Sequence, residues 1–214
     1  IPFDVYGFTS TNKDVDYDWQ KKNPGVVDLD NLSMPNICSS SFNKKDFIDS
    51  MEHMHKRATT RSSWGELCSY EEWGSTPLNQ ALMVSHHLVK KFKARHGIEK
   101  MNFITFTDGD ANNISTYTRS DAEIWPDRHN AVIQVDGTMI KTKTGSRVVT
   151  KSLLDNLSKK YNTNNIGFFM ADDNQHWRQR LWILANSLNK HSEEYKRDAN
   201  KEYRQNKCVT VDNV

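Results

Sequence analysis

The chain has 214 residues, of which 36% are hydrophobic and 26% are charged, and its formal net charge is +2 at pH 7. This length and apolar fraction predict one globular domain, spanning residues 1–214, with a buried core. The near-neutral charge argues against a nucleic-acid-binding protein, which usually carries a concentrated basic face. The sequence contains no run close to the roughly 18 apolar residues that a membrane-spanning helix needs, so a membrane partner is not expected.

The cysteines are few, odd in number and far apart, at Cys38, Cys68 and Cys208. No Cys-x-x-Cys pair occurs, which argues against a disulfide framework and against a zinc cluster. Three ordinary thiols fit a reducing compartment best. The sequence therefore predicts a cytoplasmic protein.

The first 61 residues predict a strand, a long loop and a helix. Residues 1–9 alternate apolar and polar side chains, which indicates a strand that begins without any lead-in. Residues 10–41 are rich in Asp, Asn, Ser and Pro and predict a loop. Residues 43–61 predict a helix, with apolar side chains at helical spacing at Phe47, Met51, Met54 and Ala58.

The strongest helix signal in the chain begins at Thr76. A threonine is a good N-cap, and Pro77 after it suits the first helical position, where its missing N–H costs nothing. Gly97 suits the residue that closes the helix in a left-handed conformation. The inward face is expected to consist of Leu78, Leu82, Ser85, Val89 and Phe92.

A β-hairpin is predicted around Asp136-Gly137. This dipeptide separates two apolar runs, residues 131–135 and 138–142, and Asp-Gly is typical of a two-residue hairpin turn. We expect the hairpin to be an insertion that decorates the main sheet.

The remaining elements alternate between strand and helix. Strands are predicted at 101–107 and 166–171, and helices at 147–161, 177–188 and 192–205, with a last strand at 208–211. In the helix over 147–161 we expect four side chains to point inward: Val148, Leu153, Leu154 and Leu157. This alternation predicts an α/β fold with a doubly wound, mainly parallel sheet that helices cover on both faces.

A candidate metal site arises from two of these elements. Ligands of an open parallel sheet bind outside the carboxyl ends of its strands, next to helix N-termini. Asp108 follows the strand over 101–107, and Thr76 begins the preceding helix. A hydroxyl and a carboxylate are hard oxygen ligands of the kind that Mg²⁺ prefers. Alone, Thr76 could be only a helix cap and Asp108 only a turn residue, but their order around one helix favours a shared site.

The segments Gly-Ser-Thr-Pro-Leu-Asn-Gln-Ala-Leu at 74–82 and Phe-Ile-Thr-Phe-Thr-Asp-Gly at 103–109 resemble two loops of the von Willebrand factor A domain. That resemblance implies a doubly wound α/β fold with a metal-ion-dependent adhesion site. Thr76 matches the family's threonine ligand, and Asp108 matches its aspartate. The form of the threonine loop, with Ile-Pro-Phe-Asp-Val-Tyr-Gly-Phe-Thr-Ser upstream, is most similar to the intracellular branch that includes cobalt- and magnesium-chelatase subunits.

One loop of the family's site is missing from these residues. Its Asp-x-Ser-x-Ser pattern does not occur, and Ser39-Ser40-Ser41 has no aspartate two positions earlier and falls in the predicted loop. The resemblance implies that the first strand and its loop precede Ile1, come from another chain, or have been lost from the domain. Two ligands leave most of an octahedral shell to water, so weak binding of Mg²⁺, or of Mn²⁺, is expected. The rim of the site would hold Ser75, Gly109 and Asp110.

The resemblance implies a non-catalytic interaction domain rather than an enzyme. The metal ion of such a site keeps one coordination position for a carboxylate of a protein partner, and an AAA+ ATPase of the MoxR or chelatase type is the partner implied. Two alternatives stay open. The chain could be a subunit of a chelatase that inserts cobalt or magnesium into a tetrapyrrole, or a structural component, for example of a phage particle, whose site is inactive.

Overall fold

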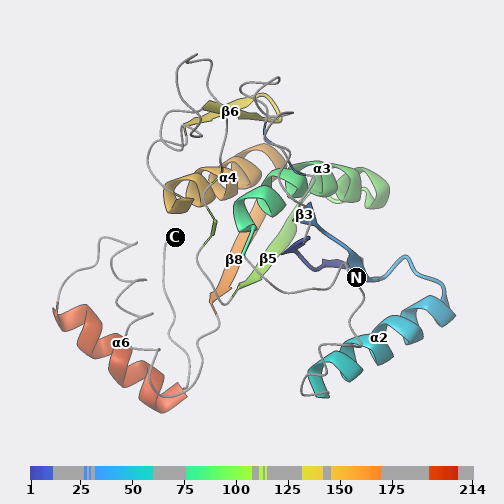
Figure 1. Cartoon of the computed structure of the whole chain (residues 1–214), viewed down its shortest axis with the longest axis horizontal. Helices are drawn as coiled ribbons and strands as arrows, with labels where there is room; N and C mark the ends of the chain where they lie inside the picture. Colours follow the sequence, from blue (N-terminus) through green and yellow to red (C-terminus); the bar gives the residue numbers. More distant parts are fainter. Residues whose placement is uncertain are drawn as a thin grey trace. The chain divides into compact units, whose positions relative to one another are not determined.

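The computed structural model of the chain shows a mixed α/β structure (Figure 1). Among the residues it describes, eight strands form four two-stranded sheets. The chain packs as two compact units, the first made of Ile1–Phe103 with Asp110–Asn165 and the second of Ile104–Gly109 with Ile166–Val214. The structure describes residues 1–11, 27, 29, 32–59, 76–107, 111–112, 114, 132–141, 146–169 and 193–206.

The N-terminal residues form two short antiparallel pairs. Strand β1 (Asp4–Tyr6) pairs with β4 (Asn36–Ser39), and β2 (Thr9–Ser10) pairs with β3 (Leu32–Ser33). The expected single strand is therefore split in two, and the prediction of a loop is wrong for β3 and β4. These polar segments are extended because the backbone of the first strands supplies their hydrogen bonds, which local composition does not reveal.

Helix α2 (Lys44–Thr59) confirms the first predicted helix. Asn43 caps it, since its Oδ1 accepts a hydrogen bond from the backbone N–H of Asp46 at 2.9 Å. The apolar face of α2 is only partly covered, because Met51 is 48% exposed and Ile48 is 45% exposed.

Helix α3 (Leu78–His96) confirms the second predicted helix and its inward face, since all five side chains of the expected stripe are buried. Gly97 closes it in the left-handed region, with φ 63°. The prediction of Thr76 as the N-cap is wrong. Pro77 occupies the cap position, without a side-chain cap, and its carbonyl oxygen accepts the N–H of Ala81 at 2.9 Å.

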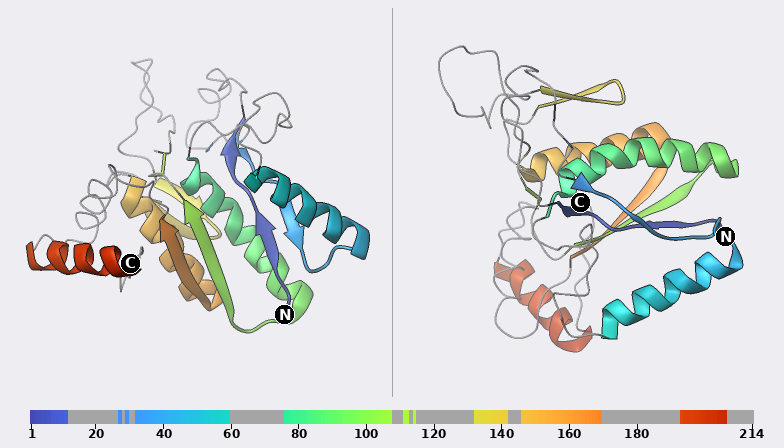
Figure 2. Two further views of the ribbon diagram at one scale, coloured as in Figure 1. Left: turned by 90° about the horizontal axis from the view of Figure 1, so that it is seen from below. Right: turned by 45° about the vertical axis from the view of Figure 1, so that its right-hand side comes forward.

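Strands β5 (Met101–Thr107) and β8 (Thr163–Phe169) form a parallel pair, as predicted (Figure 2). On one face, an Asn102–Asn164 hydrogen bond and stacked rings of Phe106 and Phe168, 4.8 Å apart, join the two strands. This face is open: Phe106 is 57% exposed and Phe168 is 49% exposed. The expectation that helices cover both faces is therefore not met by the described residues. Both strands contribute residues to each compact unit.

Helix α4 (Ser146–Tyr161) lies alongside α3 (Figure 1). Leu153 and Leu157 are buried and Leu154 is partly buried, as expected. The expectation for Val148 is wrong, because Val148 is 45% exposed and its neighbour Val149 is buried. A shift of one position rotates a helical residue by about 100°, enough to move a valine from solvent to core.

The hairpin is confirmed. Strands β6 (Val132–Val135) and β7 (Thr138–Lys141) pair antiparallel, and both turn residues have positive φ, 48° at Asp136 and 82° at Gly137. The hairpin forms a sheet of its own and does not pair with β5 or β8. Alternate apolar side chains of its two strands are buried in the cluster that α3 and α4 also form.

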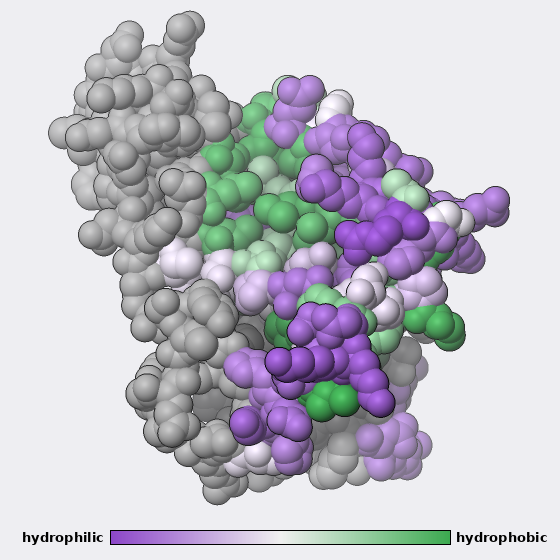
Figure 3. All heavy atoms as spheres, turned by 90° about the vertical axis from the view of Figure 1, so that its right-hand side faces the viewer, coloured by the Kyte–Doolittle hydropathy of each residue, from purple (hydrophilic) through white to green (hydrophobic). Residues whose placement is uncertain are grey.

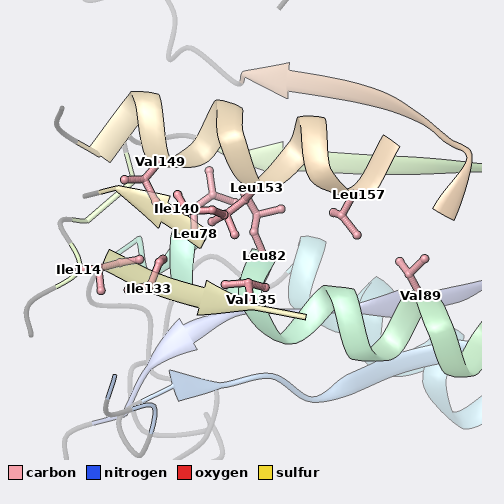
Figure 4. Close-up of a cluster of buried hydrophobic side chains, with 10 residues drawn as sticks. All are labelled: Leu78, Leu82, Val89, Ile114, Ile133, Val135, Ile140, Val149, Leu153 and Leu157. Atoms are coloured by element: carbon pink, nitrogen blue, oxygen red, sulfur yellow. The ribbon is translucent and has the colours of Figure 1, made fainter. Parts of the chain in front are cut away.

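The core lies between α3, α4 and the hairpin (Figure 4). The inner faces of β5 and β8 support it, since Met101 and Phe103 pack against it and the side-chain amide of Asn165 donates to the Leu154 carbonyl at 2.6 Å. Ten buried residues form the cluster: Leu78, Leu82, Val89, Ile114, Ile133, Val135, Ile140, Val149, Leu153 and Leu157.

The turn at Gly137 gives a clear stability test. Gly137→Ala is expected to lower the free energy of unfolding by about 1–2 kcal/mol, because an L-residue is strained at this φ. A Cβ at Gly137 would meet no atom within 4 Å, so backbone strain alone is measured. Gly167→Ala is the control, since a Cβ there also meets nothing and its φ lies outside the positive region. Equal urea midpoints for the two variants would contradict the strained-turn interpretation.

Helix α6 (Glu193–Asn206) belongs to the second unit and confirms the predicted helix over 192–205. The predicted helix at 177–188 and the predicted strand at 208–211 lie outside the described residues.

Candidate functional site

Thr76 lies two residues before the start of α3, and residues 97–100 connect this helix to β5. A metal site at Thr76 and Asp108 would require the N-terminus of the helix and the carboxyl end of the strand to share one edge, and it stays a prediction. The side chain of Thr76 is half-buried. The other predicted site residues, Ser75, Asp108, Gly109 and Asp110, lie outside the described residues.

A backbone hydrogen bond joins the two loops of the predicted site. The N–H of Asn112 donates to the carbonyl oxygen of Thr76 at 2.9 Å. Asn112 lies five residues beyond the end of β5, so the segment after this strand returns to the residue that precedes α3. This contact brings the segment that follows Asp108 in sequence to the backbone of Thr76.

The buried side chain of Asn79 forms hydrogen bonds to the segment after β5 and to the start of α4. Its side chain is fully buried. Its amide nitrogen donates to the carbonyl oxygen of Ser146 at 3.1 Å and, at 3.4 Å, to that of Asn112, and its Oδ1 accepts from the hydroxyl of Thr150 at 2.6 Å. One side chain therefore ties α3, the segment after β5 and the start of α4. The sequence patterns did not predict this role; the signal was a polar side chain directly after the inward-facing Leu78 in the first turn of α3.

The first turn of α3 contains no acidic side chain. The positive end of its helix dipole is therefore not neutralised by the helix itself, which favours an anionic group nearby. The last turn holds Lys93, Arg95 and His96, which complement the negative end. The electrostatics of α3 thus direct anions to the end that carries Thr76.

A second cluster of hydroxyl and carboxylate groups lies at the opposite end of α3. The hydroxyl of Ser39 donates to the carboxylate of Asp4, and Arg95 lies 3.6 Å from the same carboxylate. Ser39 ends β4 and does not lie in the loop expected there. A helix of 19 residues is roughly 28 Å long, so Asp4 and Ser39 cannot bind one metal ion together with Thr76.

In the part of the chain that the structure describes, no group of three or more His, Cys, Asp or Glu side chains is placed to hold a metal ion. Cys38 is a buried free thiol, and the Ser50 hydroxyl donates to its sulfur at 3.3 Å. Cys68 and Cys208 lie outside the described residues.

The face of the molecule drawn in Figure 3 carries both hydrophobic and hydrophilic side chains. On the face drawn in Figure 3, hydrophobic side chains gather in a patch that hydrophilic side chains border. Over the described helices, none is both long enough and apolar enough to span a membrane.

Comparisons of the chain with protein families, with curated proteins and with solved structures return no match.

Proposed function

We propose that this chain is a von Willebrand factor A-like interaction domain with a doubly wound sheet. In this proposal Thr76 and Asp108 bind a Mg²⁺ ion, which recognises an acidic group on a protein partner, and that partner is an AAA+ ATPase of the MoxR or chelatase type. The domain carries out no chemistry of its own.

The observation that supports this proposal most directly is the hydrogen bond from Asn112 to Thr76. Two loops far apart in sequence must meet if they are to share a metal ion, and this bond joins the segments that carry them. The parallel pairing of β5 with β8 is of the kind that a doubly wound sheet contains.

The chemistry of the two side chains fits a bridging ion. A hydroxyl and one carboxylate neutralise only part of the charge of a divalent cation. The remaining charge attracts a further carboxylate, and the uncompensated N-terminus of α3 adds to that attraction. Recognition of an acidic side chain follows from this charge balance.

Paramagnetic Mn²⁺ tests the site without needing the partner. Added to the ¹⁵N-labelled chain at millimolar concentration, it is expected to broaden the amide resonances of residues 76, 78, 79, 111 and 112, and excess Mg²⁺ is expected to reverse this. Asp108→Ala should abolish the broadening. Thr76→Val should weaken it, because valine removes the hydroxyl but keeps the backbone acceptor of Asn112.

Asp49→Ala is the matched control, since Asp49 is an exposed aspartate of α2. Its Mn²⁺ response should equal that of the unaltered chain. Broadening that persists in Asp108→Ala, or that spares the residues around Thr76, would refute the proposal.

A further inference from the structure

His86 is a buried imidazole between α3 and α4. Its side chain is 1% exposed, and its Nε2 lies 3.3 Å from the carbonyl oxygen of Leu153 in α4. A carbonyl oxygen can only accept, so Nε2 carries the hydrogen of the neutral ring. Nδ1 then holds a lone pair, and it has no hydrogen-bond partner among the described residues. The site therefore suits the neutral imidazole, because the described residues supply no hydrogen-bond acceptor for an N–H at Nδ1.

The groups around His86 compensate a positive charge only in part. From α4, the ring of Tyr161 meets the imidazole edge to face at 6.1 Å, and Lys160 contributes a repelling cation. From the hairpin turn comes Asp136, whose carboxylate is already paired with Lys160 at 2.6 Å and accepts the hydroxyl of Tyr161. From α3, Lys90 acts on the same carboxylate.

We propose that His86 makes the packing of α4 and the hairpin on α3 sensitive to acid. A proton taken up at Nδ1 creates a buried cation whose new N–H has no acceptor. Burying an unpaired charge is strongly unfavourable, so α4 moves away from α3 and lets water reach the ring. The device is independent of any metal at Thr76.

The direction of the pH effect follows from linkage. Burial lowers the pKa of His86 below its ordinary value of 6.5, and the bond to Leu153 and the charge of Asp136 only partly oppose this. The opened state therefore binds more protons than the closed state. Stability from this group is fully present above about pH 6.5 and is lost as the pH falls from there through the lowered pKa of the closed state.

Hydrogen exchange with mass spectrometry on the full chain tests the proposal. Between pH 7.5 and 5.5, after correction for intrinsic exchange rates, the opening constant of α4 and hairpin amides should rise, by up to about tenfold for a group with the ordinary pKa of 6.5 in the opened state. His86→Gln should remove this rise, because the amide of glutamine can donate to Leu153 and does not titrate. His87→Gln is the matched control, since His87 is the exposed neighbour, and it should behave like the unaltered chain.

A measurement that needs no variant keeps the proposal falsifiable if His86→Gln fails to fold. In histidine-labelled protein, ¹⁵N shifts should show the Nε2–H tautomer of His86 at pH 7.5, and its protonation should coincide with faster exchange in α4. Protonation of His86 near pH 6.5 with unchanged α4 exchange would overturn the proposal. So would an equal pH response in His86→Gln and the unaltered chain.

Discussion

Replacing Leu153 by alanine is expected to lower the free energy of unfolding by about 2–5 kcal/mol, the largest effect of any single substitution considered for this chain. The side chain of Leu153 is fully buried and belongs to the same cluster as Leu82 of α3 and Ile140 of the hairpin (Figure 4). Truncation removes three carbon atoms from the junction of three elements and leaves a cavity there.

The cavity at Leu153 cannot close easily. The side chain of Asn79 ties the start of α4 to α3, and Asp136 ties the hairpin turn to the end of α4 through Lys160 and Tyr161. Elements fixed at both ends relax little, so the cost should lie well above that of the transfer of the removed carbons alone. Urea denaturation followed by circular dichroism measures the loss, and an unchanged m-value would show that stability alone has changed.

Val148→Ala is the control for Leu153→Ala, because Val148 belongs to the same helix but is 45% exposed. Its effect should stay within about 0.5 kcal/mol, as is usual for surface positions. A loss as large as that of Leu153→Ala would show that helix propensity, and not core packing, dominates α4.

Local patterns predicted several elements of this fold well. The apolar stripe of α3 and the left-handed Gly97 could be predicted because both follow from helix geometry within one segment. Asp136-Gly137 likewise specifies its own turn, since both residues tolerate positive φ. Each of these signals depends only on residues close together in the chain.

Features that depend on distant partners could not be predicted. Strand β4 is extended because β1 pairs with it, a contact between Val5 and Cys38 that no local pattern reveals. The exposure of Phe106 and Phe168 on one face of β5 and β8 could not be predicted either. An apolar run does not indicate whether helices cover one face of a strand or both.

The candidate site also combines short local motifs with contacts that depend on tertiary packing. Two short motifs indicate Thr76 and Asp108; the structure describes Thr76, two residues before α3, and Asp108 lies outside the described residues. The contact that joins the loops runs through the backbone of Asn112 and the buried side chain of Asn79, and both depend on tertiary packing. Metal ligation by Thr76 and Asp108 stays a prediction.

Asn79→Ala is expected to cost about 1–3 kcal/mol, because it removes three hydrogen bonds of a buried side chain and leaves the carbonyl of Asn112 without its side-chain donor. The carbonyl of Asn112 loses its side-chain donor, and that of Ser146 loses one donor but keeps the hydroxyl of Thr150 at 2.9 Å. Thr150 loses an acceptor at 2.6 Å. Three segments lose their shared contact at once. Urea denaturation measures the global loss, and amide exchange at Asn112 reports the junction.

The local readout separates a hydrogen-bond role for Asn79 from simple packing. If Asn79 holds the segment after β5 against α3, the amide of Asn112 should exchange faster in the variant than global unfolding alone explains, because its bond to Thr76 depends on that position. Asn206→Ala, at an exposed position at the end of α6, should change neither quantity. Slow exchange at Asn112 in Asn79→Ala would mean that the backbone bond holds the loops together by itself. In that case the buried amide would stabilise the start of α4 but would not position the residues of the candidate site.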